Sequence, residues 1–427
     1  MILSSEPKFR MYPWSLPQGW DWIALEKLCS HFYGGGTPNR SKSEYFNGDI
    51  VWVTPTDIDV NNPVQVVKSS RTTLTNNGLE SSSAKLLPPG TVLFSSRATI
   101  GKIAIAGVSL CTNQGFANLV CSHNLNNHYL AWCLRTLTPE VIKLASSTTY
   151  LEISRGNLRK FKIPIPCPED SIRSLDTQRR IVTRIETLIY EVKQSRNLVD
   201  EIRQDVEQLI FTALNQVINK LDEQYPDSLT IKELISIGKI KIEGGGTPAR
   251  NNVKYWDGRI PWVSPKDMKR WYIYDSQEHI ATDALKETSV KLIPQGAILI
   301  VVRGMILAHT LPVAITQSEV TINQDMKALI SISNLLPDYL GYILRARSSF
   351  ILQLVETAAH GTKRLKTDTI MDIVIPIPPE SEQKRIIEYL NCIQNEVDEI
   401  LKGLSQDVKL LDLLEQSILD QAFRGEL

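Results

Sequence analysis

Two short runs in this 427-residue sequence have the acid-x-lysine spacing found in metal-dependent nucleases: Asp325-Met326-Lys327 and Glu382-Gln383-Lys384. Catalysis of that kind needs further carboxylates around the metal ion. The six histidines are scattered, and no cysteine stands in a CxxC pair or at metal-ligand spacing from a histidine. The sequence also lacks the Asn-Pro-Pro-aromatic run with which an adenine methyltransferase holds a flipped base. We therefore expect no enzyme activity, no metal site and no cofactor in this chain, and keep a metal-dependent nuclease as an alternative.

Binding is the chemistry that the remaining polar motifs suggest. Gly-Gly-Gly-Thr-Pro occurs twice, at residues 34–38 and 244–248. Its backbone N–H groups could cradle a phosphate, but no Lys-Ser/Thr follows as in a nucleotide-binding P-loop, so we favour a tight structural turn. Arg97 and Arg303 each follow a β-rich run. Arginine is the commonest side chain that recognises guanine in the major groove, and a structural salt bridge is the alternative role.

These motifs belong to an internal repeat that extends along the chain. The ordered identities between the two copies include Tyr45 and Tyr255, Trp52-Val53 and Trp262-Val263, Asn113-Gln114 and Asn323-Gln324, and Ile163-Pro164-Ile165-Pro166 and Ile375-Pro376-Ile377-Pro378. Chance does not produce so many identities in one order, so each copy is one structural unit. Strand-like runs at 91–96 and 297–302, bounded by Pro and Gly, predict a mixed domain in each copy. The Ile-Pro-Ile-Pro segments predict extended exits from these domains, and the two tryptophans are expected in the core.

Each domain is followed by a long amphipathic helix. Apolar residues alternate at spacings of mostly four and three, the heptad a/d pattern of a coiled coil, at positions 181, 185, 188, 192, 199, 206, 209 and 213, and again at 386, 390, 393, 397, 400, 404, 411, 414 and 418. The contact residues that we expect are Ile181, Ile185, Leu188, Val192, Ile386, Leu390, Ile393 and Val397. Because the first helix leads to the second domain and the second helix starts there, the pair must run antiparallel, which brings the chain ends close together.

The predicted fold class is therefore α+β. Two similar α/β domains, at 1–168 and 223–378, are separated by a long antiparallel two-helix coiled coil, with an internal pseudo-twofold repeat. The helical spacers are expected at 169–222 and 379–427. Between the first exit strand and its helix we expect extra residues, Ser171 to Asp176, that the second copy lacks.

The charge is distributed unevenly, although the net charge is zero. Residues 1–170 hold 16 basic and 12 acidic side chains, residues 225–379 hold 18 and 15, and both helical segments are acidic. Mildly basic domains allow contact with nucleic acid, while acidic helices stay away from phosphates. No apolar run is long enough to span a membrane, Met1 to Arg10 has no apolar signal core, and scattered cysteines fit a reducing compartment. We expect a cytoplasmic protein.

Taken together, these motifs resemble the specificity (S) subunit of type I restriction-modification systems, over essentially the whole chain. Further landmarks are Leu16-Pro17-x-Gly19-Trp20, Gln178-Arg179-Arg180, Gln383-Lys384-Arg385 and the ending Ile418-Leu419-x-x-Ala422-Phe423-x-Gly425-x-Leu427. The resemblance implies two target recognition domains, each of which reads one half of a bipartite site on double-stranded DNA. It also implies two methyltransferase subunits docked on the helices and domains, and two restriction/translocase subunits in the full complex. S-adenosylmethionine, ATP and magnesium would belong to those partners.

Which residues contact DNA can be narrowed by comparing the copies. Two domains that read different bases should not share their base readers, so Asn113, Gln114, Asn323 and Gln324 are interpreted as scaffold or phosphate contacts. Base readers should lie where the copies differ, in residues 39–44 against 249–254 and 59–71 against 269–280. There Lys269, Arg270, Trp271 and Tyr272 form a basic-aromatic cluster suited to DNA, with an incidental exposed loop as the alternative.

A second basic segment supplies the remaining candidates. Lys363, Arg364 and Lys366 lie in or next to Gly361-Thr362-Lys363-Arg364-Leu365, and are interpreted as phosphate contacts or as a solvated basic face. The first copy has Thr149-Tyr150-Leu151-Glu152-Ile153 in this place, so the same role does not carry over to it. A coiled-coil scaffold for proteins without DNA specificity stays open beside the nuclease.

Overall fold

The computed structural model describes residues 14–59, 62, 64–97, 99–145, 151–358 and 361–427. The chain divides into two compact units. Unit 1 consists of Met1–Val199 and Gln406–Leu427, and unit 2 consists of Asp200–Ser405. Each unit therefore holds one mixed domain together with a part of each long helix. The N-terminal Met1 to Arg10 and the Thr149-Tyr150 part of the first-copy segment lie outside the described residues.

Unit 1 is built on two small sheets and a strand pair. The five-stranded sheet has the order β2 (Cys29–Gly34), β9 (Phe116–Cys121), β6 (Val92–Ser95), β7 (Ile103–Ala106), β4 (Gln65–Val67). The three-stranded sheet has the order β5 (Thr73–Leu74), β3 (Phe46–Val53), β8 (Cys111–Thr112), and β1 (Trp20–Ala24) pairs with β10 (Lys162–Pro166). The helices are α1 (Leu25–Leu28), α2 (Asn76–Glu80), α3 (Asn127–Thr136), α4 (Thr138–Ile142) and α5 (Arg155–Lys160), with 3-10 turns η1 (Ser43–Tyr45) and η2 (Pro55–Asp57).

Unit 2 has the same sheets with the same strand order. The five-stranded sheet is β12 (Ile240–Gly244), β19 (Met326–Ser331), β16 (Ile298–Val301), β17 (Val313–Thr316), β14 (Tyr272–Ile273). The three-stranded sheet is β15 (Glu278–Ile280), β13 (Ile260–Val263), β18 (Thr321–Ile322), and the strand pairs are β11 (Leu229–Thr230) with β22 (Val374–Ile375) and β20 (Glu356–Thr357) with β21 (Lys363–Arg364). The helices are α7 (Ile231–Ser236), α8 (Thr282–Glu287), α9 (Pro337–Ala346), α10 (Ser348–Gln353) and α11 (Thr367–Met371), with η3 (Val253–Tyr255) and η4 (Met305–Ala308).

The central strands show why the sequence folds in this way. β6, apart from its last residue Ser95, and β16 are apolar runs, and both are buried along their length, as expected for a strand covered on both faces. Each follows a glycine in the left-handed region, Gly90 at φ +85° and Gly296 at φ +80°, a conformation that favours glycine. The β-rich runs, the extended first exit in β10 and the internal repeat are thus confirmed.

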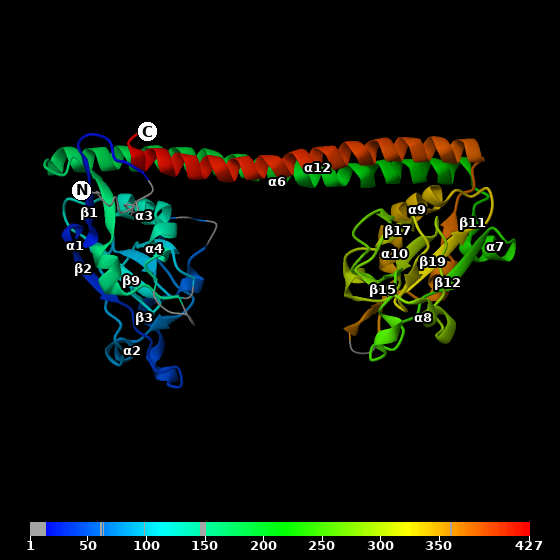
Figure 1. The fold of residues 1–427 in the computed structure, drawn as a ribbon, viewed down its shortest axis with the longest axis horizontal. Helices are drawn as coiled ribbons and strands as arrows, with labels where there is room; N and C mark the ends of the chain where they lie inside the picture. The colour runs from blue at the N-terminus through cyan, green and yellow to red at the C-terminus, as the bar shows by residue number, and fades with distance from the viewer. Residues whose placement is uncertain (1–13, 60–61, 63, 98, 146–150, 359–360) are drawn as a thin grey trace, which may run out of the picture. The chain divides into compact units, whose positions relative to one another are not determined.

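Each domain is fastened to its long helix by the same glutamine. Gln178 of α6 (Ser171–Gln224) and Gln383 of α12 (Glu380–Arg424) are both buried. Their side-chain carbonyls accept the N–H groups of Asn126 and Leu336, at 2.8 and 2.9 Å. These two N–H groups lie just before α3 and α9, the helices next to the long pair in Figure 1. The glutamine that begins each Gln-basic landmark, Gln178 or Gln383, therefore fixes its domain to the long helix.

The long helices run antiparallel. In unit 1 the N-terminal part of α6, at Ile181 and Ile185, shares a core with Leu419 and Phe423 near the C-terminus of α12. Farther along α6, Arg196 pairs with Asp412 and Glu415. In unit 2 the C-terminal part of α6, residues 210–221, shares a core with Ile386 and Leu390 near the start of α12. Figure 1 shows the two helices side by side within each unit.

The helix contact uses one heptad column rather than two. Buried positions recur at heptad spacing, at 185, 192, 199, 206 and 213 of α6 and at 390, 397, 404 and 418 of α12, with the half-buried Leu411 between the last two. In the second column Leu188 and Ile393 are half-buried, while Ile181 and Ile386 are buried in the cores of their units. The expected a/d seam is wrong at Leu209, Ile400 and Leu414, whose exposed fractions are 50%, 42% and 49%. Two helices bury only a narrow stripe between them, so the second column is left at the side of the contact.

A second expectation is also wrong. Ser171 to Asp176 do not lie between the exit strand and the helix, because α6 begins at Ser171. The Asp170 carboxylate accepts the N–H groups of Ile172 and Arg173 at 3.1 and 3.0 Å, and thereby caps the helix earlier than expected. The second exit segment is strand only to Ile375, and α12 begins at Glu380.

The first described residues of the chain lie against its C-terminal end. The Trp14 indole N–H donates to the Phe423 carbonyl at 3.1 Å, and Gly425, at φ +73°, lies beside Pro17 and Trp20. The expected proximity of the two ends is thus confirmed for the part of the chain that the structure describes. Among the described residues, no helix combines the length and apolarity that a membrane crossing needs.

Candidate nucleic-acid interface

The two glycine loops are rigid parts of the scaffold. A Cβ on Gly35 or on Gly245 would lie inside the backbone of Asn113 or Asn323, so only glycine fits. The next glycine, Gly36 or Gly246, donates its N–H to β8 or β18 at 2.9 Å. Its carbonyl accepts the indole N–H of Trp52 at 3.0 Å or of Trp262 at 2.9 Å. Both tryptophans are buried, which confirms their expected core position.

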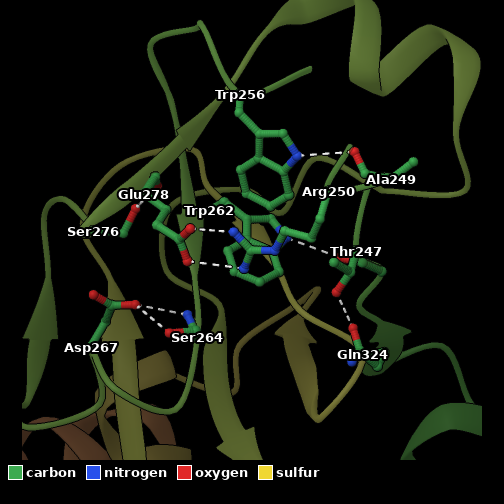
Figure 2. Close-up of polar contacts among 11 residues, drawn as sticks. Thr247, Ala249, Arg250, Trp256, Trp262, Ser264, Asp267, Ser276, Glu278 and Gln324 are labelled. Carbon is green, nitrogen blue, oxygen red and sulfur yellow. Dashed lines mark hydrogen bonds and ion pairs between the residues drawn. The ribbon is translucent and has the colours of Figure 1, made fainter. Parts of the chain in front are cut away.

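The Asn-Gln pairs complete this scaffold. The Asn113 side chain accepts the Gly115 N–H at 3.0 Å, and the Asn323 side chain accepts the Asp325 N–H at 3.1 Å. The Gln114 carbonyl accepts the hydroxyl of Thr37, and the Gln324 carbonyl accepts that of Thr247 (Figure 2). In each unit, asparagine closes a turn and glutamine ties that turn to the glycine loop, which agrees with the scaffold interpretation.

An aspartate anchors the segment in which the copies differ. Asp267 accepts the Ser264 N–H at 2.8 Å with one oxygen (Figure 2) and the Gln277 N–H at 3.0 Å with the other. Asp57 holds Thr54 and Arg71 in the same way, at 2.8 and 3.1 Å. One carboxylate thus holds a residue on each side of the divergent stretch by hydrogen bonds, and the residues between them are free to differ. The two copies share this aspartate, Asp57 and Asp267, in their sequences, but the sequence does not show that it is an anchor.

The predicted arginines have different surroundings in the two units. Arg97 forms an ion pair with Glu152, with Nη2 at 2.7 Å and Nε at 3.1 Å from one carboxylate oxygen. Arg303 occupies the equivalent bridge position, but faces Arg364 instead of a glutamate. Arg303 and Arg364 are both exposed. Arg97 therefore has the structural salt bridge that was the alternative role, while Arg303 is open to a ligand.

The lysines beside Arg364 already have partners. Lys366 pairs with Glu356 at 2.7 Å, and Lys363 donates to the Thr357 hydroxyl at 2.9 Å. Both partners belong to the short β20–β21 hairpin. This leaves Arg364 as the member of the basic segment whose side chain is unengaged by any residue that the structure describes.

A further arginine, missed as an individual candidate, lies in the divergent segment 249–254. Arg250 forms a two-pronged ion pair with Glu278 and lies over the rings of Trp256 and Trp262, at 4.0 and 4.8 Å (Figure 2). The hydrogen bond that Arg250 donates to Glu278 raises the pKa of Arg250, and the same bond lowers the pKa of Glu278. Arg250 and Trp256 lie near each other in the sequence, which could have indicated an arginine–aromatic contact. The ion-pair partner Glu278 lies on β15, which the sequence does not place beside Arg250.

Three of the four residues of the basic-aromatic cluster line a pocket of about 820 Å³ in unit 2. Lys269, Arg270 and Trp271 line it together with Arg345, which donates to Gln394 of α12 at 3.0 Å. Trp271 stacks on Tyr342 at 4.7 Å, and Tyr272 donates to Asp338 at 2.7 Å. Burial lowers the pKa of Arg345. The cluster therefore faces the domain–helix junction of its own unit as well as solvent.

The acid-x-lysine runs show no catalytic arrangement. Glu382 pairs with Arg385 one helical turn away, at 2.6 Å. Asp325 lies on the turn before β19, where Asn323 donates to its carboxylate at 3.5 Å. Within the described ranges, no three His, Cys, Asp or Glu side chains converge as metal ligands. Nothing in these surroundings favours the nuclease alternative.

Comparison with known proteins gives matches over both units. The model of the type I restriction modification DNA specificity domain matches residues 17–204 and 226–410. The specificity subunit of the Escherichia coli type I restriction enzyme EcoR124I/EcoR124II is 32% identical over 283 residues, which cover 66% of this chain and 67% of that protein. The MjaIX specificity subunit of Methanocaldococcus jannaschii is 26% identical over 426 residues, 96% of this chain and 94% of that one.

Two solved structures share the fold. A chain in a structure of a type I R-M system, described in terms of complex assembly and conformational transition, aligns with a TM-score of 0.73 at 22% identity, covering 97% of this chain and 100% of that chain. The HsdS subunit from Thermoanaerobacter tengcongensis aligns with a TM-score of 0.58 at 22% identity, covering 97% and 99%. The arrangement of paired mixed domains and long helices is therefore shared with these proteins.

Proposed function

We propose that this chain, which belongs to the family of type I restriction-modification DNA specificity domains, reads one half of a bipartite site on double-stranded DNA with each of its two units. It is the DNA-recognition subunit of such a system. The proposal gives this chain no catalytic step. Methylation, cleavage and translocation, with S-adenosylmethionine, ATP and magnesium, are assigned to partner subunits.

One observation carries the proposal: the scaffolds of the two units coincide, while the side chains that they expose differ. The glycine loop, the buried tryptophan, the Asn-Gln turn and the anchoring aspartate make the same hydrogen bonds in both units. The segments between them differ in charge and in aromatic content. A shared frame with different exposed residues is what reading two different half-sites requires, because sequence is read through base edges by individual side chains.

The long helices fit the role of a spacer. Each is a single uninterrupted helix, of 54 residues in α6 and 45 in α12. A rigid element that separates two DNA-reading domains fixes the number of base pairs between the half-sites. We therefore assign the unspecified gap of the target to the helices, and the specified halves to the domains.

The same helices offer a docking face for two methyltransferase subunits. Apolar side chains of the second heptad column remain exposed in both units, at Leu414 in unit 1 and at Leu209, Ile202 and Ile400 in unit 2. An apolar column at heptad spacing is the surface that further helices cover in a bundle. One face in each unit gives two docking positions. Restriction/translocase subunits would join through the methyltransferases. All six cysteines are free thiols, in keeping with work in the cytoplasm.

The test is co-expression with a methyltransferase subunit, followed by mapping of methylated bases in the host genome. The expected result is one split motif with two short specified halves and a fixed gap. A variant with one heptad inserted after Val199 and another after Ser405 keeps the helix contact in register. This variant should widen the gap and leave both halves unchanged. An insertion in α6 alone is the matched control, and should abolish methylation. Altered halves with an unchanged gap would refute the spacer role.

A further inference from the structure

The bridge that follows β6 is charge-neutral, and the bridge that follows β16 is doubly positive. In unit 1 Arg97 is neutralised by Glu152, and in unit 2 Arg303 stands opposite Arg364. Neither Arg303 nor Arg364 has an ion pair or a side-chain hydrogen bond with any residue that the structure describes, whereas the nearby Lys366 is paired with Glu356. Like charges directly opposite each other on paired backbone are unfavourable. Two arginines paired across this bridge therefore suit a position that a negatively charged ligand occupies.

The neighbouring residues do not supply that negative charge. The Arg303 N–H donates to the Asp325 carbonyl at 3.2 Å, but the Asp325 carboxylate is turned to the Asn323 amide. Glu356, on the adjacent hairpin, is engaged by Lys366. Arg303 and Arg364 thus keep their charge and their hydrogen-bond donors available to a ligand.

A second position shows the reverse arrangement. In unit 2 Arg250 is held by Glu278 and by two tryptophan rings. Its counterpart in the first glycine loop segment is Arg40. Strand pairing identifies the counterpart of Glu278: Val51 faces Thr73 as Pro261 faces His279, so Thr72 stands where Glu278 does. Arg40 is exposed and forms no ion pair with any described residue. Each unit thus has one of two equivalent arginine positions closed by a glutamate and the other open.

We propose that the two units contact DNA through different arginines: unit 2 through Arg303 with Arg364, and unit 1 through Arg40. This inference rests on the proposed function, because it names the residues with which each unit reads its half-site. A glutamate that pairs with an arginine occupies its donors, and also cancels the local field that a phosphate would experience. An open arginine offers five N–H donors to a phosphate or to the O6 and N7 atoms of a guanine. The two half-sites are then distinguished by which position is open.

The experiment for unit 2 transplants the arrangement of unit 1. Arg364→Glu should fold, because the same Arg–Glu pair is already accommodated at this bridge in unit 1. In the assembled methyltransferase complex, its affinity for a duplex that carries the methylated motif should fall at least about tenfold. The dependence of log Kd on log salt should become shallower by about two, since two phosphate contacts would be lost. Lys232→Glu, an exposed lysine on α7, makes the same change in charge and should leave the affinity near that of the unchanged complex.

The experiment for unit 1 compares two arginines in one domain. Arg40→Gln should weaken binding about tenfold. The double variant Arg97→Gln with Glu152→Gln removes the closed pair without a change in net charge, and should bind as the unchanged complex does. Loss of preference at one base pair of a half-site identifies a base contact, and uniform weakening on all sequences identifies a phosphate contact.

The outcomes separate this inference from the function that it rests on. If the unchanged complex methylates no split motif, the proposed function fails. If it does so while Arg364→Glu binds no worse than Lys232→Glu, or while the neutral double variant weakens binding as much as Arg40→Gln, the assignment of arginines is overturned.

Discussion

Replacing Gly245 by alanine should destabilise unit 2 by about 3–5 kcal/mol, although it adds one methyl group. The new Cβ would overlap the carbonyl oxygens of Asn323 and Ile322 and would lie 2.5 Å from the Asn323 carbonyl carbon. Ordinary van der Waals contact begins at 3.4 Å. The glycine loop and β18 must therefore separate by well over an ångström before the alanine fits.

The magnitude follows from what that separation breaks. The loop is held to β18 by the bond from the Gly246 N–H to the Ile322 carbonyl, at 2.9 Å, and to the core by the bond from the Trp262 indole to the Gly246 carbonyl, also at 2.9 Å. Losing each bond costs about 1 kcal/mol, and more where the group is left buried without a partner. Overpacking that persists after relaxation adds about 1–3 kcal/mol.

Urea unfolding, followed by circular dichroism and by tryptophan fluorescence, measures the effect. Gly403→Ala is the matched control, because a Cβ there meets nothing within 4 Å and the residue lies within α12. Alanine is the better helix former, so this control should gain up to about 1 kcal/mol. A Gly245→Ala variant within about 0.5 kcal/mol of the unchanged protein would show that the loop yields freely, and the rigid-scaffold argument would fail.

Three further outcomes are expected. Leu209→Glu with Ile400→Glu places charge on the exposed heptad column. This double variant should weaken methyltransferase binding at least about tenfold in a pull-down or calorimetric titration. The control Gln204→Glu, on α6 but outside the column, should leave that binding unchanged. Gln383→Leu leaves the Leu336 N–H without its partner and should lower the free energy of unfolding by about 1–3 kcal/mol; a smaller change would mean that water replaces the bond. Arg250 lowers the pKa of Glu278, so the ion pair stabilises unit 2 above the ordinary carboxyl pKa of 4.5, and this stabilisation is lost as the pH falls through the lowered value. Urea unfolding between about pH 6 and 3 should therefore show a weaker pH dependence in Glu278→Gln, and equal profiles would contradict the pairing.

The frame of each unit could be predicted from the sequence because it depends on local patterns. Glycines, prolines and β-rich runs mark turns and strands by themselves, and a repeat doubles every such signal. The two-column seam was wrong for a different reason. A heptad pattern states that a column is apolar, but not which partner covers it. Leu209 and Ile400 satisfy the pattern and are nevertheless exposed, because two helices bury one column only.

The pairing of the arginines was beyond sequence reasoning because it depends on strand register. Arg40 and Arg250 are aligned by the glycine loops at an offset of 210 residues, whereas Arg97 and Arg303 are aligned at 206. Glu278 and Glu152 become partners only when β15 lies beside β13 and when residue 152 forms a bridge with Arg97. A change of one residue in either register would direct these side chains to the opposite face. The basic residues could therefore be named, but not divided into open and closed.

This division also explains how one fold can hold two different recognition surfaces. The glycine loop, the tryptophan and the aspartate anchor are tied to backbone atoms, so a substitution there costs several kcal/mol and both units keep the same residues. An exposed ion pair such as Arg97–Glu152 contributes only about 0–1 kcal/mol to folding. Exchanging its glutamate for an arginine, as at Arg364, changes the local charge by two while the fold is hardly affected. Positions whose side chains matter little to stability and strongly to the surface field are therefore the ones at which the two half-site readers can diverge.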